Sequence, residues 1–152
     1  MKIRQKSEIE VIIVMASLMS LVALAIDALL PAITDIGMSI NVIDSQNNQL
    51  LITMIFLGLG FGQLISGPLS DSFGRKPVIY VGFIVFAFAS LVCIFSKNLE
   101  MMIFGRILQG IGLSAPRTIS IAMVRDRFSG NYMAKVMSFV VVIFILVPVV
   151  AP

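Results

Sequence analysis

The sequence has no histidine, no tryptophan and a single cysteine among its 152 residues. The lone Cys93 excludes an intrachain disulfide, and the absence of histidine removes histidine general bases and the usual zinc ligand sets. Charge is also scarce, because only 12% of the residues are charged while 59% are hydrophobic. Soluble domains carry about 25% charged residues and about 45 to 50% apolar ones. With a mean hydropathy of +1.05, the composition excludes a water-soluble domain and indicates an integral membrane protein.

Five apolar segments are predicted to cross the bilayer as helices. A window of about 20 residues places them at residues 11–33, 50–69, 78–95, 101–124 and 134–152. We therefore predict an all-α membrane protein in which residues 1–152 form one polytopic helix bundle. The fifth segment is still apolar at Val149 and Val150 and has no basic or aromatic anchor after it. We expect from this that the bundle is incomplete and that the chain is truncated at its C-terminus.

The basic residues outside the apolar segments predict the topology. Lys97 alone lies on one side of the membrane. The other side holds eight bases, namely Lys2, Arg4, Lys6, Arg75, Lys76, Arg125, Arg127 and Lys135. Because cytoplasmic connections carry the excess of Lys and Arg, we expect a multi-pass protein of the cell (inner) membrane with a cytoplasmic N-terminus. A net charge of +3 distributed in this way marks topology and does not indicate a nucleic-acid partner.

Three ionisable residues lie inside apolar segments: Asp27 in the first, and Arg106 and Arg117 in the fourth. Each costs about 2.5 to 3.5 kcal/mol at the bilayer centre, so each requires a partner or a function. Asp27 and Arg106 are both expected about 10 Å below the same membrane face, and they are predicted to pair if their helices are neighbours. A paired acid inside the bilayer suits a carboxyl group that takes up and releases protons.

Arg106, Gln109 and Arg117 are predicted to share one side of the fourth helix. The two arginines are eleven residues apart, which at 100° per residue returns to within about 20° of the same direction. Lipid does not accommodate such a polar stripe, so we expect Gln109 and Arg117 to line a substrate pathway. Two alternatives stay open: Asp27 and Arg106 form a static structural pair, and Arg117 snorkels toward the lipid headgroups.

Pro31, Pro116 and Pro148 each lie inside an apolar segment. A proline removes the hydrogen bond to the carbonyl group four residues earlier, which for Pro31 is the carbonyl of Asp27. We expect these three positions to let their helices bend in a protein that rocks between conformations. Proline is more frequent in membrane helices than in soluble ones, so this pattern supports the interpretation without carrying it.

The short connection between the second and third segments combines turn residues with charges. Its notable residues are Gly67, Asp71, Gly74, Arg75 and Lys76. Gly74 permits a left-handed turn, and Asp71 can accept a charge-assisted hydrogen bond from Arg75. We interpret the connection as a polar clasp that gates one end of two helices. It is not a nucleotide-binding loop, because six residues separate its glycines and Pro77 follows Lys76.

The same connection resembles the signature of the major facilitator superfamily, Gly-x-Leu-(Ser/Ala)-Asp-(Arg/Lys)-x-Gly-Arg-(Arg/Lys), and departs from it at Ser72, where the family usually has a base. Residues 106–112 are similar to the family's fourth-helix motif, Arg-x-x-Gln-Gly-x-Gly, whose arginine is associated with proton coupling. Residues 27–31 resemble the Asp-x-x-Leu-Pro pattern of drug:proton antiporters, and residues 124–126 and 144–152 resemble the bicyclomycin-resistance type. The resemblance implies a fold of about twelve helices, of which this chain holds about five in the N-terminal half.

By this resemblance, the chain derives from a secondary transporter that exports drugs or other small organic compounds in exchange for protons through Asp27 and Arg106. The proton gradient would supply the energy without a cofactor. The implied partners are a small-molecule substrate, protons, the lipid bilayer and the missing C-terminal half of the same polypeptide. A transporter of a sugar or organic acid and a non-transporting membrane fragment stay open as alternatives. An enzyme is disfavoured, because no nucleophile and base with recognisable spacing occur.

Overall fold

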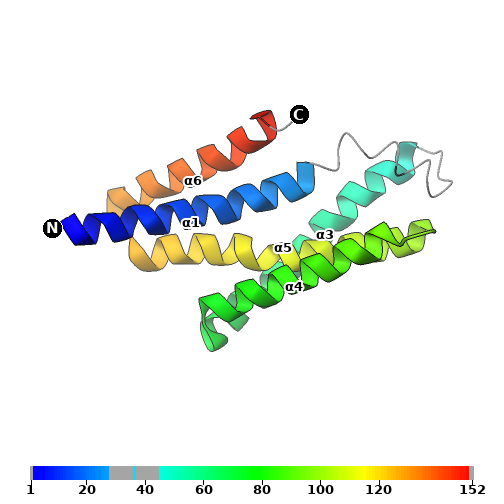
Figure 1. The fold of residues 1–152 in the computed structure, drawn as a ribbon, viewed down its shortest axis with the longest axis horizontal. Coiled ribbons are helices and arrows are strands. Elements are labelled where there is room, and N and C mark those ends of the chain that lie inside the picture. The colour runs from blue at the N-terminus through cyan, green and yellow to red at the C-terminus, as the bar shows by residue number, and fades with distance from the viewer. Residues whose placement is uncertain (1, 28–35, 37–44, 151–152) are drawn as a thin grey trace.

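The computed structural model describes the backbone of residues 2–27, 36 and 45–150, and the side chains of residues 9–27, 36 and 49–146. Five helices make up this part of the chain (Figure 1): α1 (Lys2–Asp27), α3 (Ser45–Phe73), α4 (Arg75–Ile94), α5 (Leu99–Arg127) and α6 (Gly130–Val150). The described residues contain no β-strand. The predicted fold class, an all-α bundle of membrane-crossing helices, is confirmed.

Four of the helices are long and apolar enough to cross a membrane. These spans are Ile9–Asp27, Gln49–Phe73, Arg75–Ile94 and Leu99–Arg127, and Gly130–Leu146 is a shorter apolar helix. The expected connection of residues 70–77 reduces to Gly74 alone. Gly74 has a φ of 91°, a left-handed conformation that ends α3 without steric cost. Pro77 then lies in the first turn of α4, where its missing N–H has no helical partner to lose.

The helix α5 lies at the centre of the bundle, in contact with α1, α3, α4 and α6. In its membrane-crossing window 56% of the residues are buried, against 22% in α4. Small residues permit this close packing. A Cβ atom at Gly58 of α3 would collide with the backbone of Ile107, and one at Gly112 would lie 2.7 Å from the carbonyl oxygen of Gly82 in α4. In lipid such close van der Waals contact is a main source of helix association.

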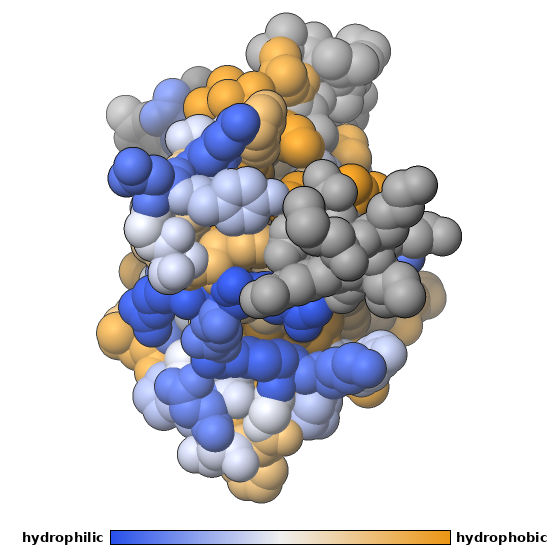
Figure 2. All heavy atoms as spheres, turned by 90° about the vertical axis from the view of Figure 1, so that its left-hand side faces the viewer, coloured by the Kyte–Doolittle hydropathy of each residue, from blue (hydrophilic) through white to orange (hydrophobic). Residues whose placement is uncertain are grey.

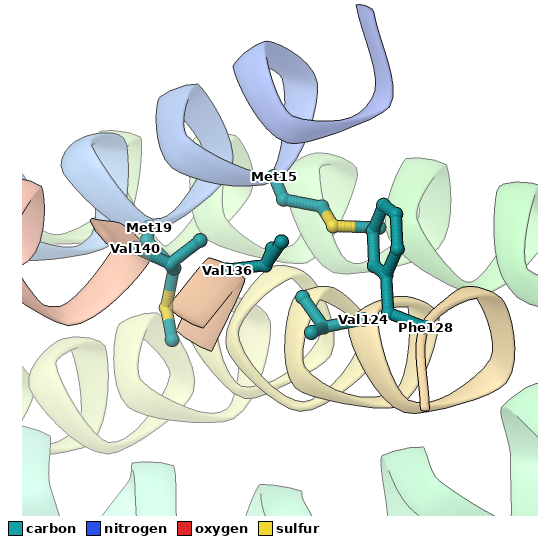
Figure 3. Close-up of a cluster of buried hydrophobic side chains, with 6 residues drawn as sticks. All are labelled: Met15, Met19, Val124, Phe128, Val136 and Val140. Atoms are coloured by element: carbon teal, nitrogen blue, oxygen red, sulfur yellow. The ribbon is translucent and has the colours of Figure 1, made fainter. Parts of the chain in front are cut away.

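A cluster of buried apolar side chains fastens α1 and α6 to the end of α5 (Figure 3). It consists of Met15, Met19, Val124, Phe128, Val136 and Val140. A second cluster joins α1 to α3 and α5 through Val22, Ile55, Leu59 and Leu113. The first and fourth predicted spans, which correspond to α1 and α5, are therefore neighbours, as the proposed pairing of Asp27 with Arg106 requires.

Polar residues gather at the end of the bundle that holds the N-terminus. Figure 2 shows this end, with hydrophilic side chains spread across it. The turn between α3 and α4 and the turn between α5 and α6 lie at the same end (Figure 1). By contrast, α4 exposes a row of large apolar side chains along its length, including Tyr80, Ile84, Phe88 and Leu91. Such a row fits a helix that faces lipid.

Candidate functional site

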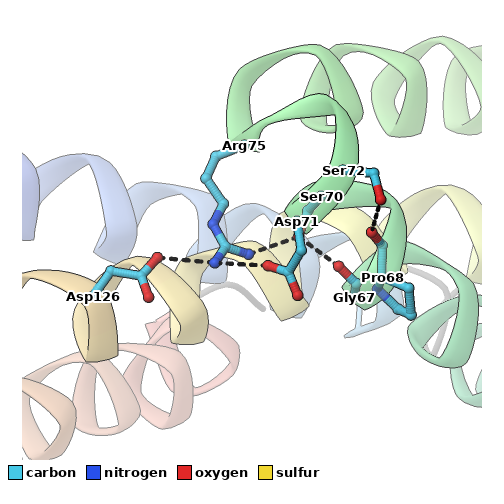
Figure 4. Close-up of polar contacts among 7 residues, drawn as sticks. All are labelled: Gly67, Pro68, Ser70, Asp71, Ser72, Arg75 and Asp126. Carbon is cyan, nitrogen blue, oxygen red and sulfur yellow. Dashed lines mark hydrogen bonds and ion pairs between the residues drawn. The ribbon is translucent and has the colours of Figure 1, made fainter.

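Arg75 is the centre of a polar cluster at the α3–α4 turn (Figure 4). Its Nη2 atom lies 3.0 Å from Asp71 Oδ1 and 2.9 Å from Asp126 Oδ2, and its Nη1 atom donates to Ser70 Oγ at 2.7 Å. Ser70 in turn donates to the carbonyl oxygen of Gly67 at 2.8 Å. The predicted contact between Asp71 and Arg75 is present. The cluster also ties this turn to the end of α5, because Asp126 lies on that helix.

Two other residues of the connection take no part in this cluster. Lys76 is exposed and forms no ion pair within the described part of the chain. Ser72, which occupies the position of the family's usual base, donates to the carbonyl oxygen of Pro68 at 3.1 Å. Asp126 belongs to residues 124–126, which were noted above for their family resemblance, but it was not predicted to contact Arg75. The sequence contains one hint of this contact. Asp126 is an acid near the end of an apolar segment, on the membrane side predicted for Arg75, although 51 residues separate the two.

Arg106 is buried between helices, with 6% of its surface exposed. Its Nη1 atom donates to Gln109 Oε1 at 2.8 Å, and Gln109 Nε2 donates to Ser90 Oγ of α4 at 2.9 Å. Ser90 then donates to the carbonyl oxygen of Phe86 at 2.8 Å. The Nε atom of Arg106 is buried and has no hydrogen-bond partner among the described residues. A cavity of about 360 Å³ lies beside Arg106, Gln109, Ser90 and Cys93.

The predicted ion pair between Asp27 and Arg106 is wrong. Neither ion pair within the described part of the chain includes Asp27, which is half-buried at the end of α1. Helix rotation explains the error. Val22 faces α5 through Leu113, and Asp27, five positions later, is turned by about 140° from that direction. The Arg106 guanidinium instead bonds to Gln109, which leans toward α4.

Arg117 does not join the hydrogen-bonded chain of Arg106 and Gln109, although the predicted stripe places all three on one side of the helix. The guanidinium carbon of Arg117 lies over the ring of Phe144 in α6, 5.9 Å from the ring centroid. Two cavities adjoin it. One, of about 410 Å³, is lined by Gln63, Leu64, Thr118 and Ile121 as well as Arg117. The other, of about 310 Å³, is lined by Met19, Val141, Phe144 and Ile145 with Arg117 and Ile121.

The three prolines expected to bend their helices have different outcomes. Pro31 lies outside the described residues. Pro116 lies inside α5 and Pro148 inside α6, and both helices continue through them. Pro116 has no N–H to donate to the carbonyl of Gly112, four residues earlier. That carbonyl lies against Gly82 of α4. Close helix packing therefore covers this carbonyl.

Comparison with known proteins places the chain among membrane transporters. Residues 12–152 match the family model described as Major Facilitator Superfamily. The chain is 37% identical over 149 residues to a bicyclomycin resistance protein homolog of Haemophilus influenzae, an alignment that covers 98% of this chain and 37% of that protein. It is 38% identical over 129 residues to the uncharacterized MFS-type transporter YdgK of Bacillus subtilis, covering 85% of this chain and 32% of YdgK.

A third relative carries a name that states a resistance phenotype. The multidrug resistance protein MdtL of Salmonella paratyphi C is 35% identical over 127 residues, which is 84% of this chain and 32% of MdtL. The chain thus spans about a third of the length of the curated relatives it matches. The resemblance to bicyclomycin-resistance proteins and to drug transporters, noted from short motifs, is confirmed over almost the whole chain.

Proposed function

The chain belongs to the major facilitator superfamily, and on this premise we propose that it forms the N-terminal part of a proton-coupled exporter of drugs or other small organic compounds. The observation that carries the proposal is the likeness, over 84% of this chain or more, to proteins named for bicyclomycin and multidrug resistance. The charged residues inside α5 support it, because such residues are costly in lipid and mark substrate and ion pathways.

Asp27 is the residue that we propose takes up and releases the coupling proton. It is half-buried, and no cation pairs with it within the described residues. A carboxyl group without a fixed cationic partner changes its protonation without first breaking an ion pair. Arg106, expected at a similar depth on the neighbouring helix, has an Nε donor without a hydrogen-bond partner among the described residues. We propose that Arg106 binds an acceptor that comes and goes during the cycle, whether the substrate or Asp27 itself in another conformation.

The Arg75 cluster is proposed as the gate at the end of the bundle that holds the N-terminus. It joins the α3–α4 turn to α5 through contacts that are partly exposed, with the side chains of Asp71 and Asp126 at 68% and 54% exposure. Exposed pairs of this kind contribute up to about 1 kcal/mol each, so they can break and re-form during transport. This end of the bundle has the excess of Lys and Arg, so we propose that it faces the cytoplasm. We propose the inner membrane as the location of the protein.

Dye export from inverted membrane vesicles tests the proposal. The longer transporter that contains this chain would be supplied with a proton gradient and a panel of fluorescent dyes of both charge signs. Asp27→Asn is expected to abolish gradient-driven export of every transported dye while the protein still inserts in normal amounts. Glu100→Gln is the matched control, because Glu100 is an exposed acid in the first turn of α5 and export should continue. Undiminished gradient-driven export by Asp27→Asn would remove Asp27 from the mechanism.

A further inference from the structure

Arg117 lies in the apolar part of α5, and its side chain reaches across to Phe144 of α6. It lies ten residues before the end of α5 at Arg127, which places its Cα about 15 Å from that end. Phe144 lies fourteen residues after the start of α6 at Gly130, about 21 Å from the same end. Because helical side chains lean toward the N-terminus of their helix, the Arg117 side chain leans toward the bilayer centre, where it meets the Phe144 ring.

This direction decides between the two interpretations that the sequence left open. An arginine that snorkels extends its guanidinium toward the headgroups. Arg117 extends it over Phe144 of α6, whose Cα lies about 21 Å along its helix from the polar end of the bundle, against about 15 Å for the Cα of Arg117. The side chain is only half-buried, and two adjoining cavities share it. Arg117 therefore lines a groove between α3 and α5 that opens to the surface of the described helices, where Leu64 is 73% exposed.

The charge of Arg117 is not neutralised within the described part of the chain. No carboxylate there forms an ion pair with it, and its guanidinium lies over the Phe144 ring. A cation over an aromatic ring at a partly exposed site is stabilised by about 0.5 to 1 kcal/mol. That is less than the cost of about 2.5 to 3.5 kcal/mol for an arginine at mid-membrane. The site is thus short of a negative charge.

The walls around Arg117 combine hydrogen-bonding groups with apolar surface. Gln63 offers two amide donors and has no hydrogen bond within the described residues. The Thr118 hydroxyl accepts a hydrogen bond from Ser66 at 3.3 Å, which leaves its own proton to donate. Leu64 and Ile121 add aliphatic surface. The volume of about 410 Å³ falls in the usual range for sites that hold small organic molecules.

We propose that Gln63, Arg117 and Thr118 form a binding site for the carboxylate of an amphipathic organic compound, whose apolar part contacts Leu64 and Ile121. A guanidinium binds a carboxylate through two parallel hydrogen bonds, which gives both strength and orientation. This inference rests on the proposed export function and names its substrate class: compounds with a carboxylate or a similar anionic group beside an aromatic or aliphatic body. A lipid headgroup offers the same anionic chemistry, and the experiment separates the two sources.

The test measures binding of a matched pair of compounds to the 152-residue chain in nanodiscs of zwitterionic lipid. Naphthalene-2-acetic acid and naphthalene-2-acetamide share a ring system and differ in charge. The sequence has no tryptophan, so naphthalene fluorescence is free of that background. The acid is expected to bind about tenfold more tightly than the amide, the difference that a charged hydrogen bond provides. Arg117→Gln should reduce that ratio to about one, and Arg117→Lys should retain part of it.

Matched controls make the result specific to this cavity. Arg125→Gln removes an exposed base near the end of the same helix and should leave the ratio unchanged. Adding phosphatidylglycerol to the nanodiscs at high salt, which screens its surface charge, should also leave the ratio unchanged, and loss of acid binding there would assign the site to lipid headgroups. The proposal is overturned if acid and amide bind equally to both this chain and the longer transporter, or if Arg117→Gln retains the preference. Acid binding without gradient-driven export would instead contradict the proposed function alone.

Discussion

Arg75 and Arg117 carry the same charge in opposite circumstances. Arg75, at the polar end of the bundle, has two carboxylates and a hydroxyl from its own chain within 3.0 Å. Arg117, inside the membrane, has an aromatic ring at 5.9 Å and no carboxylate among the described residues. Arg106 is intermediate, with one amide partner and one unpartnered nitrogen. Among the described residues, the water-exposed end of the bundle supplies carboxylates to Arg75. Arg106 and Arg117, inside the apolar part, have no carboxylate partner there.

This contrast separates two roles for charge in one bundle. A cation with internal partners holds elements together, and its loss weakens an existing contact. A cation in lipid without an internal anion retains binding energy for a group that arrives from elsewhere.

The largest effect is expected from Gln109→Leu. This change removes the acceptor of the buried Arg106 guanidinium, leaving a charged donor without a partner, which costs about 2 kcal/mol. Unfolding of the chain in mild detergent by increasing amounts of denaturing detergent measures this loss. Gln63→Leu, in the open cavity, serves as the control and should cost below about 0.5 kcal/mol, since Gln63 has no hydrogen bond within the described residues.

A double variant sharpens this prediction. Arg106→Met combined with Gln109→Leu should recover most of the lost stability, because neither the buried charge nor its acceptor is then present. Equal effects of Gln63→Leu and Gln109→Leu, or strictly additive losses in the double variant, would show that Arg106 does not depend on Gln109.

An intermediate effect is expected from Arg75→Ala. The substitution removes the shared cation between Asp71 and Asp126, and should cost about 1 kcal/mol at low salt and less at high salt. Faster amide hydrogen exchange at the α3–α4 turn would report the loss of its tie to α5. Lys76→Ala is the matched control, because this adjacent base is exposed and forms no ion pair with any residue that the structure describes. If both variants exchange at the wild-type rate, the cluster does not hold the turn.

The smallest effect is expected from Ser72→Lys, which introduces the base that the family usually has at this position. Ser72 is exposed and contributes a single hydrogen bond to the carbonyl of Pro68. The two acids nearby are already paired with Arg75, so the added charge should change the free energy of unfolding by less than about 0.5 kcal/mol. A stabilisation above about 1 kcal/mol, measured by the same detergent titration, would mean that Arg75 leaves the acids under-neutralised.

The sequence predicted those features that depend on residues close together in the chain. Apolar segments indicated the bundle, and the short connection that holds Asp71 and Arg75 indicated their contact. The partner Asp126 was out of reach, because it is 51 residues away and depends on how α5 packs against the turn. For Asp27 and Arg106 the sequence predicted how deep each residue lies in the bilayer. It did not predict the rotation of α1 about its axis, which decides where Asp27 points. Because α1 is apolar on most sides, its residues do not reveal which face meets α5.

Arg117 shows a different limit of the sequence. Its spacing from Arg106 predicted a common side, yet long side chains from one side of a helix reach different neighbours. Arg106 bonds to a residue that contacts α4, whereas Arg117 reaches α6. Only the position of Phe144 relative to the helix ends revealed that Arg117 leans inward.

The most direct test of the view that the interior arginines await external anions is the ratio of naphthaleneacetic acid to naphthaleneacetamide affinity, measured side by side in the wild type, Arg117→Gln and Arg125→Gln. We expect ratios of about ten, about one and about ten, respectively. The same ratio in all three proteins would show that Arg117 does not bind the carboxylate.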